Sequence, residues 1–313
     1  MKSKKLILVP VLAMMALSIV GCNSSVATKQ KSKTSMFSKS VSLVVDNDNK
    51  NALPKNYRIT STKINKQTSI NLTGLSTMNM SGSGAVSENS LKLIKEKIGN
   101  HPVIDVDLRE ESHLFVNGIG ISLYGNKDDE NINLTQAEVI NDETNKLNTI
   151  IASKELKIKS KSKKSVGNIS SINNIETVQT EEQLAKSLGI GYVRFAVPDH
   201  KRPQDVQVDS FIQFVKTLPN GTWLHFHCRA GVGRTTTFMV MYDMMKNAKT
   251  VNFNDIMKRQ QLIGGANLLG GQDASSASDA KARSTFLKDF YNYCGENNNN
   301  FNTTWTQWIK SHK

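Results

Sequence analysis

Residues 227–235 constrain this chain more than any other segment, and they read His-Cys-Arg-Ala-Gly-Val-Gly-Arg-Thr. Five residues separate Cys228 from Arg234, which is enough chain to curl into a semicircle whose backbone N–H groups point inward. Gly231 and Gly233 allow the unusual dihedral angles and the close approach to a ligand that such a nest needs. The run therefore predicts a cradle for a phosphate group, with a cysteine nucleophile at its base.

The segments on either side of this loop predict a strand before it and a helix after it. Residues 222–227 are typical of a short buried strand, and residues 235–246 are typical of a buried helix. The order of strand, glycine loop and helix is the context that a phosphate-binding loop requires. The N-terminus of the helix would direct its partial positive charge at the bound anion. The alternative is an inert buried cysteine in an ordinary turn between strand and helix.

The side chains of the loop fit the transfer of a phosphoryl group. The thiolate form of Cys228, which a helix N-terminus and inward N–H groups favour, would attack phosphorus and form a phosphocysteine. Arg234 offers a planar fork for two phosphate oxygens. Thr235 is placed to hydrogen-bond the sulfur and to help it leave. The residues between the cysteine and the arginine would bind the phosphoryl group, and they are Arg229, Ala230, Gly231, Val232 and Gly233.

The loop resembles the signature of the protein tyrosine phosphatase superfamily, and three further segments narrow the resemblance. These segments are 105–118, 193–200 and 260–265. Together with the loop they resemble the bacterial protein-tyrosine-phosphatase-like phytases, which remove phosphates from inositol polyphosphates. The matching segments run from about residue 53 to about residue 269, with the weakest match over 126–180. The resemblance implies a phosphocysteine mechanism that needs no metal or organic cofactor.

A phosphocysteine mechanism needs a proton donor for the leaving oxygen, and Asp199 is the candidate. It follows a β-rich run, residues 192–197, and Pro198. The resemblance places it on the mobile acid loop of the family, without the tryptophan that many tyrosine phosphatases carry before the proline. His200 could contact a substrate phosphate or hold Asp199, and Lys201 is a further candidate for substrate binding. The alternative for Asp199 is a turn-forming residue after proline.

Other polar residues are candidates because of the resemblance. Family members use a basic residue near the start of the core on substrate phosphates, which makes Arg58 a candidate, although a surface salt bridge would explain it equally well. Glu111 and His113 are expected to orient the cradle rather than to react. Gln260 or Gln261 could position the hydrolytic water. Arg229 stands where some phytases carry an acid, and it could add a phosphate contact from the rim.

The alternation of strands and helices around the loop predicts an α/β fold with a mainly parallel central sheet flanked by helices. Strands are expected over 101–108, 192–197 and 222–227, and helices over 87–98, 135–147, 180–189, 205–218, 235–246 and 252–262, with another helix within 283–313. The resemblance implies a small partial β-barrel beside this core. An insertion around residues 126–180 would contribute to it.

The first 22 residues resemble a bacterial lipoprotein signal peptide. A basic start precedes an apolar run over residues 6–20, and Gly21-Cys22 resembles the lipobox. Cys22 would become a lipidated N-terminus that anchors the protein at the bacterial cell envelope, and residues 23–52, rich in Ser, Lys and Asn, would form a flexible tether to a phosphatase domain over 53–313. The alternatives are an ordinary secretory signal with a chance cysteine, or an uncleaved anchor.

The charge of the chain suits a polyanionic partner such as an inositol polyphosphate. The formal net charge is +13, and it becomes +10 when Lys2, Lys4 and Lys5 are removed with the signal peptide. A nucleic acid is not expected as a partner, because no nucleic-acid motif is present and aromatic residues make up 6% of the chain. No cluster with metal-ligand spacing is visible along the sequence, so no metal is expected.

Three other functions remain open from the sequence. A protein tyrosine or dual-specificity phosphatase would use the same chemistry, but it would need an aromatic wall to stack the phosphotyrosine ring. A non-catalytic phosphate-binding lipoprotein would have lost Cys228 or Asp199, and both remain. A redox sensor would pair Cys228 with Cys294 and would form a disulfide under mild peroxide.

Overall fold

The computed structural model describes residues 42–64, 68–124, 131–158, 166–167 and 169–313. The predicted signal peptide, Cys22 and most of the predicted tether lie outside the described residues. Among the helices that are described, none is both long enough and apolar enough to cross a membrane.

Five strands form the central sheet, in the order β10-β4-β11-β3-β2. They are β2 (Arg58–Ile59), β3 (Met80–Ser83), β4 (Val103–Arg109), β10 (Gly191–Val197) and β11 (Trp223–His227). Every neighbouring pair is parallel except β2 with β3 at one edge. The prediction of a mainly parallel central sheet flanked by helices is therefore confirmed.

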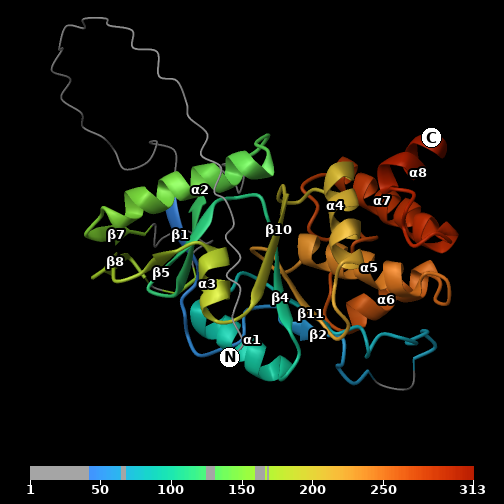
Figure 1. Cartoon of the computed structure of the whole chain (residues 1–313), viewed down its shortest axis with the longest axis horizontal. Coiled ribbons are helices and arrows are strands. Elements are labelled where there is room, and N and C mark those ends of the chain that lie inside the picture. Colours follow the sequence, from blue (N-terminus) through green and yellow to red (C-terminus); the bar gives the residue numbers. More distant parts are fainter. Residues whose placement is uncertain (1–41, 65–67, 125–130, 159–165, 168) are drawn as a thin grey trace, which may run out of the picture. The chain divides into compact units, whose positions relative to one another are not determined.

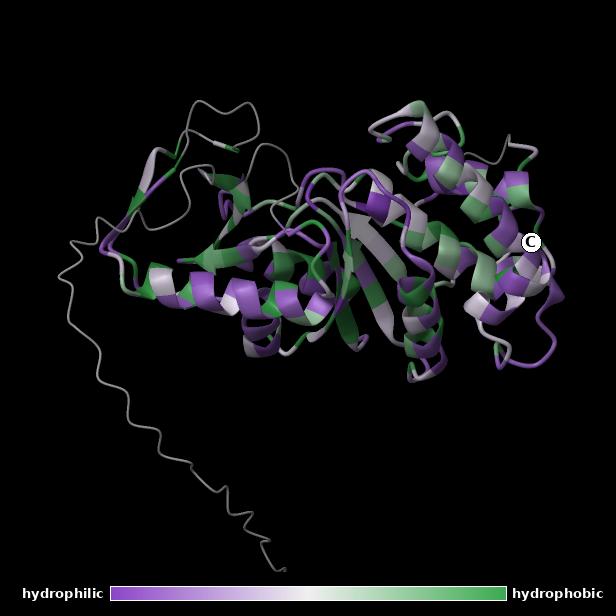
Figure 2. Ribbon diagram, turned by 90° about the horizontal axis from the view of Figure 1, so that it is seen from above, coloured by the Kyte–Doolittle hydropathy of each residue, from purple (hydrophilic) through white to green (hydrophobic). Residues whose placement is uncertain are grey.

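Helices cover both faces of this sheet (Figure 1). On one side lie α1 (Glu88–Ile98) and α3 (Glu181–Ser187). On the other lie α4 (Asp205–Lys216), α5 (Gly233–Asn247), α6 (Phe253–Leu262), α7 (Ala277–Glu296) and α8 (Trp305–Ser311). Helices α1 and α3 begin where the sequence predicts. The side chains of Ser87 and Thr180 cap them, because each accepts a hydrogen bond from the backbone N–H three residues later. Figure 2 shows hydrophilic and hydrophobic residues mixed along these helices, as expected for helices with one face buried.

The two faces of the central sheet differ in chemistry. The face toward α4 and α5 is apolar, and it includes Val106, Leu108, Phe195, Leu224 and Phe226. The opposite face carries buried polar side chains, namely Asp105, Asp107, Arg194, His225 and His227. Alternation along each strand thus places an ordinary hydrophobic core on one side and a buried polar layer on the other.

A second, smaller sheet has four strands in the order β1-β6-β5-β9, and all of its pairs are antiparallel. Its strands are β1 (Ser42–Asn47), β5 (His113–Val116), β6 (Ile119–Tyr124) and β9 (Val178–Gln179). Helix α2 (Gln136–Ile151) and the hairpin of β7 (Glu155–Lys157) and β8 (Ser171–Asn173) share a hydrophobic cluster with it. Within the described residues the sheet stays open and does not close into a barrel.

One prediction about the organisation of the chain is wrong. The tether was expected to reach residue 52, but residues 42–47 form β1, whose central residues are buried. The region 126–180 contributes β9 to the small sheet, as expected, while β1, β5 and β6 lie before that range. A strand of six residues whose partner lies far along the chain, as residues 42–47 pair with 119–124, leaves too short a pattern to be recognised in the sequence.

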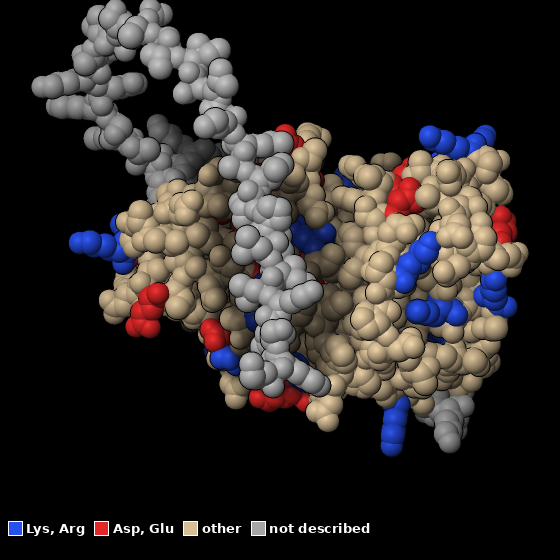
Figure 3. Space-filling model, viewed as in Figure 1, with Lys and Arg blue, Asp and Glu red and all other residues tan. Residues whose placement is uncertain are grey.

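Figure 3 shows how basic side chains are distributed on one face of the molecule. On the visible part of the face drawn in Figure 3, lysines and arginines stand singly or in small groups between acidic and neutral residues. The positive net charge alone therefore does not mark a binding surface on that face, and the site has to be found from geometry.

Candidate active site

The predicted cradle lies at the carboxyl end of the parallel strands, where open α/β sheets bind their ligands. Strand β11 ends at His227, helix α5 begins at Gly233, and residues 228–232 connect them. Three carbonyl groups of the loop accept hydrogen bonds from outside it: Arg229 O from Ala85 N at 3.1 Å, Ala230 O from Asn56 Nδ2 at 2.8 Å, and Gly231 O from Arg58 Nη1 at 2.7 Å. Because these peptide units are planar and trans, their N–H groups face the interior of the loop.

Gly231 is required at its position. Its φ of +74° is a left-handed conformation, and a Cβ atom there would lie 2.3 Å from Gly84 N and 2.4 Å from the carbonyl carbon of Ser83. No larger residue fits without moving the backbone of the neighbouring strand. The unusual dihedral angle expected for this glycine is therefore present, and the close approach that excludes a side chain is to the backbone of Ser83 and Gly84.

The thiol of Cys228 sits at the base of the loop and is 2% exposed. Its sulfur accepts a hydrogen bond from Gly231 N at 3.3 Å and another from Thr235 Oγ1 at 3.2 Å. Both donors favour negative charge on the sulfur, and the sequence placed Thr235 in this role. The geometry suits a nucleophile that must also leave as a thiolate.

The guanidinium of Arg234 is held by Glu111. Its Nη1 donates to Glu111 Oε2 at 2.6 Å and to Val197 O at 3.1 Å, and its Nη2 donates to Glu111 Oε1 at 3.1 Å. Burial lowers the pKa of Arg234, but the carboxylates of Glu111 and Asp199 raise it more, so that the group stays charged. The pair fixes the fork on the floor of the cradle, as expected for an orienting role of Glu111.

The predicted general acid lies beside that arginine. Asp199 Oδ1 is 3.0 Å from Arg234 Nη2, and Asp199 Oδ2 is 3.1 Å from His200 Nε2. Of the two predicted roles of His200, the structure supports holding Asp199. Lys201 is directed away, because its Nζ is 2.6 Å from Asp279 Oδ1, and this pairing does not support substrate binding by Lys201.

Comparisons with known proteins agree with this geometry. The model of the PTP-like phytase family matches residues 106–246, and the description of that family reads inositol hexakisphosphate. The structure of a PTP-like phytase from Bdellovibrio bacteriovorus is similar with a TM-score of 0.66 and 34% identity, covering 86% of this chain and 95% of that chain. The chain belongs to the PTP-like phytase family. The resemblance found in the sequence is thereby confirmed.

Two further relatives of this phytase-family chain are longer than it is. The PTP-like myo-inositol phosphatase from Mitsuokella multacida, in complex with myo-inositol-(1,3,4,5)-tetrakisphosphate, is similar with a TM-score of 0.80 and 37% identity over 87% of this chain and 48% of that chain. Effector protein hopD2 from Pseudomonas syringae pv. tomato is 32% identical over 75% of this chain and 52% of its own length. The chain thus spans about half the length of these two relatives.

Two substrate contacts expected from the family pattern are not supported by the structure. Arg58 is buried outside the loop, where its Nη1 donates to Gly231 O and its Nη2 to Thr236 Oγ1 at 3.0 Å. Burial lowers its pKa to about 10, and the nearby Cys228 raises it. Arg58 therefore supports the cradle from behind. Arg229 is also mostly buried, and its Nε donates to Asp46 Oδ1 at 2.8 Å.

The glutamines expected to position water are engaged elsewhere. Gln260 is fully buried, and its Nε2 donates to Asp243 Oδ2 at 2.9 Å. Gln261 donates to Asn267 Oδ1 at 3.2 Å. Neither hydrogen bond reaches the loop, so the structure does not support the water-positioning role.

The sequence missed a chain of buried ion pairs that links the small sheet to the cradle. Asp46 on β1 binds Arg229 of the loop and also Arg109, whose Nη2 is 3.0 Å from Asp46 Oδ2. Arg109 Nε in turn lies 2.9 Å from Glu111 Oε1, and Glu111 holds Arg234. Asp46 was missed because residues 23–52 were predicted to be a flexible tether, in which no buried ion pair is expected.

Lys55 is a second residue near the loop that the sequence analysis did not single out. Its carbonyl accepts a hydrogen bond from Gly84 N at 2.8 Å, and its side chain lies over Gly84. The residue is exposed as a whole, but partial burial lowers the pKa of its ammonium group, while the charges of Asp46 and Cys228 raise it. The Lys55 side chain therefore lies beside the loop, because a Cβ atom on Gly84 would meet both this side chain and Ala230 O. The sequence offered a signal, because Lys55 belongs to the segment in which a basic residue was expected.

The polar face of the sheet brings together side chains that are distant in sequence. Two groups have ligand atoms within 4.8 Å of one another, as a metal site would require: Asp105, Glu181 and His227, and Asp107, His113 and Glu181. His113 Nε2 is 2.6 Å from Glu181 Oε2, and His227 Nε2 is 3.1 Å from Glu181 Oε1. Burial lowers the pKa of His227, but Glu181 and Asp105 raise it to about 10, so that protonated His227 pairs with the Glu181 carboxylate. Burial raises the pKa of Asp105 well above its ordinary value. We assign the groups to ion pairing behind the cradle.

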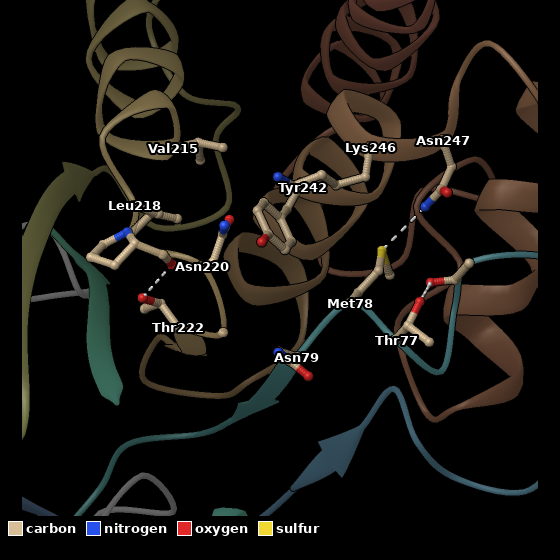
Figure 4. Close-up of a pocket in the computed structure, with 13 residues that line it drawn as sticks. Thr77, Met78, Asn79, Val215, Leu218, Asn220, Thr222, Tyr242, Lys246 and Asn247 are labelled. Atoms are coloured by element: carbon tan, nitrogen blue, oxygen red, sulfur yellow. Dashed lines mark hydrogen bonds between the residues drawn. The ribbon is translucent and has the colours of Figure 1, made fainter. Parts of the chain in front are cut away.

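The cavity drawn in Figure 4 is a different place from the cradle. It has a volume of about 290 Å³ and lies where strands β3 and β11 begin, with Asn79 and Thr222 at its edge. Tyr242 and Lys246 reach it from the last turns of α5. The amino ends of parallel strands are not where such sheets carry their catalytic groups, so this cavity is not the candidate site.

Proposed function

We propose that this chain is a phosphoric monoester hydrolase that removes phosphate from inositol polyphosphates through a phosphocysteine. One observation carries the proposal. The Cys228 sulfur accepts hydrogen bonds from Gly231 N and Thr235 Oγ1 at the base of a loop whose N–H groups face inward, with Arg234 and Asp199 beside it. Nucleophile, anion cradle and acid are then all within one site.

The reaction follows from these positions in two steps. The Cys228 thiolate attacks phosphorus, the P–S bond forms, and the P–O bond to the leaving group breaks as Asp199 gives it a proton. Water then attacks phosphorus, Asp199 takes up a proton from it, and the P–S bond breaks. Arg234 and the loop N–H groups stabilise the charge on the transferring group, and Thr235 stabilises the departing thiolate.

The surroundings of the cradle support an inositol polyphosphate over phosphotyrosine. Two basic residues lie near the loop, since the Lys55 side chain packs over Gly84 and His200 contacts Asp199. The solved Mitsuokella relative is described as a complex with an inositol tetrakisphosphate. Tyr57, which belongs to the segment that wraps the cradle, is turned inward. Its ring stacks on His225 with a centroid distance of 6.2 Å, and its hydroxyl is buried. The Tyr57 ring is therefore not positioned to stack on the ring of a phosphotyrosine substrate.

The comparison of two substrates tests this proposal. The full chain is expected to show a kcat/KM for phytate at least about tenfold above that for a phosphotyrosine peptide, about 1.4 kcal/mol of transition-state preference. A phosphate-release assay on both substrates, with Cys228→Ser as the control, measures it. The reverse preference would make the chain a protein tyrosine phosphatase. Release of phosphate from neither substrate would favour the non-catalytic binding protein.

We also propose, from the sequence of residues 1–22 alone, that the protein is exported and lipidated at Cys22. Expression in a bacterial host with labelled palmitate is expected to label the wild-type protein and not Cys22→Ala. Equal labelling of both proteins would rule out Cys22 as the lipidated residue.

A further inference from the structure

We propose that Asp273 is a positioning residue for the general acid: it holds His200, and through His200 it holds Asp199 facing the cradle. The proposal rests on the proposed function, because it assumes that Asp199 donates the proton to the leaving group. It adds a residue that lies outside the loop, outside the acid segment and outside the ion-pair chain described above.

The imidazole of His200 joins the two acids. Its Nε2 is 3.1 Å from Asp199 Oδ2, while its Nδ1 is 3.1 Å from Asp273 O and 3.5 Å from Asp273 Oδ1. A ring held at both nitrogens has one orientation, so the position of Asp273 sets the position of the Asp199 carboxylate.

The backbone at this junction is in an uncommon conformation. His200 has a φ of +63° and Asp273 has a φ of +64°, and non-glycine residues rarely adopt such values. Conformations of this kind persist where surrounding contacts hold them, and they gather at functional sites. The ring contact between these two residues is one such restraint on each of them.

A buried arginine ties the same two segments together. Arg283 on α7 is 1% exposed, and its Nη2 donates to Lys201 O at 3.3 Å while its Nη1 donates to Asp273 O at 3.4 Å. The acid segment and the segment of Asp273 therefore share one anchor.

Asp273 is itself seated on the first turn of α5. A Cβ atom added to Gly233 would lie 2.0 Å from Asp273 Oδ2, so the carboxylate occupies the space that the missing side chain leaves. The residue that orients the acid is thus packed against the cradle. This contact gives a fixed reference between the nucleophile and the acid.

The charges make the bridge strongest when His200 is protonated. The hydrogen bond that His200 donates to Asp273 raises the pKa of His200 to about 9, with partial burial lowering it and the charge of Asp199 raising it. Arg234 and Arg283 also lie near the two carboxylates. The bridge is complete below the ordinary histidine pKa of about 6.5 and is lost as the pH rises through about 9.

The test separates proton donation from the rest of catalysis. Asp273→Asn is expected to lower kcat by about tenfold on phytate, whose alcohol leaving group needs a proton, because positioned acids contribute about 10²–10⁴. It is expected to leave kcat nearly unchanged on p-nitrophenyl phosphate, whose leaving group needs little assistance, and to leave KM unchanged on both.

Two further variants frame this result. Asp279→Asn breaks an exposed pair in the same region without touching His200, and it should keep the wild-type ratio of the two substrates. His200→Asn keeps a side chain that tolerates positive φ but cannot bridge, and it should reproduce the Asp273→Asn signature if that variant does not fold. An equal loss on both substrates would overturn the positioning role.

A readout that does not depend on activity separates this proposal from the function itself. An NMR titration of the His200 imidazole is expected to give a pKa near 9 in the wild type and a clearly lower value in Asp273→Asn. A wild-type protein with no Cys228-dependent phosphatase activity would refute the proposed function. An unchanged His200 titration would refute the bridge, whatever the activity.

Discussion

Cys228→Ser is expected to lower kcat by roughly 10⁴-fold or more while substrate binding remains, because removing a nucleophile costs an enzyme about this much. The loop N–H groups and Arg234 do not depend on the sulfur, since the loop is held from outside by Ala85, Asn56 and Arg58. Steady-state rates measure the first effect, and calorimetric titration with phytate measures the second.

Cys294→Ala is the matched control for that substitution. Cys294 lies on α7 in the hydrophobic core, where burial raises the pKa of its thiol well above the ordinary value and keeps it protonated. Activity is expected to stay at the wild-type level. Retained activity in Cys228→Ser would contradict the nucleophile assignment, and lost activity in Cys294→Ala would revive the redox pairing of the two cysteines.

Glu111→Gln is expected to lower both stability and activity. Glu111 is fully buried between Arg234 and Arg109, and breaking a buried pair of this kind costs about 3–5 kcal/mol. The fork of Arg234 would lose its anchor, which should lower kcat/KM by about 10²–10³, the effect of removing one donor to a transition state. Urea unfolding and steady-state kinetics on phytate give the two values.

The pH dependence of the Glu111 effect has a definite sign. Burial raises the pKa of Glu111, but Arg234 and Arg109 lower it more, so the folded value lies below the unfolded value of about 4.3. The carboxylate therefore stabilises the fold above about pH 4.3, and this stability is lost as the pH falls toward the folded value. The difference in unfolding free energy between wild type and Glu111→Gln is expected to shrink at acidic pH.

Glu110→Gln provides the neighbouring control. Burial and the charge of Glu111 raise the pKa of Glu110 to about 7, so its ionisation opposes folding. Its replacement by glutamine is expected to leave stability unchanged or raised above pH 7. A loss of stability in Glu110→Gln as large as that in Glu111→Gln would contradict the specific role of the Glu111–Arg234 pair.

The sequence was informative where the structure is local. The cradle is built from consecutive residues, so the spacing of Cys228, the two glycines and Arg234 was enough to predict it. Helix starts at Ser87 and Thr180 depend on a side chain and a backbone group three residues apart, and they too were predictable.

The parts that were missed depend on contacts between distant residues. Strand β3 reads Met-Ser-Gly-Ser and has little strand propensity, but it pairs with β11 and leaves room at Gly82 for Met239 and Thr235. Asp273 lies 73 residues from His200, so no local pattern could join them. Arg58 was a candidate for substrate binding because of the resemblance, with a surface salt bridge as the alternative, and its burial could not be read from the sequence.

Trapping of the covalent intermediate tests the central claim most directly. The Asp199→Asn variant, which lacks the base for the second step, would be mixed with a radiolabelled aryl phosphate that has a good leaving group, quenched in acid and digested. The account predicts label on one peptide, the one that contains Cys228, and none in Cys228→Ser. Release of product without protein-bound label, or label on another residue, would contradict a phosphocysteine at this site.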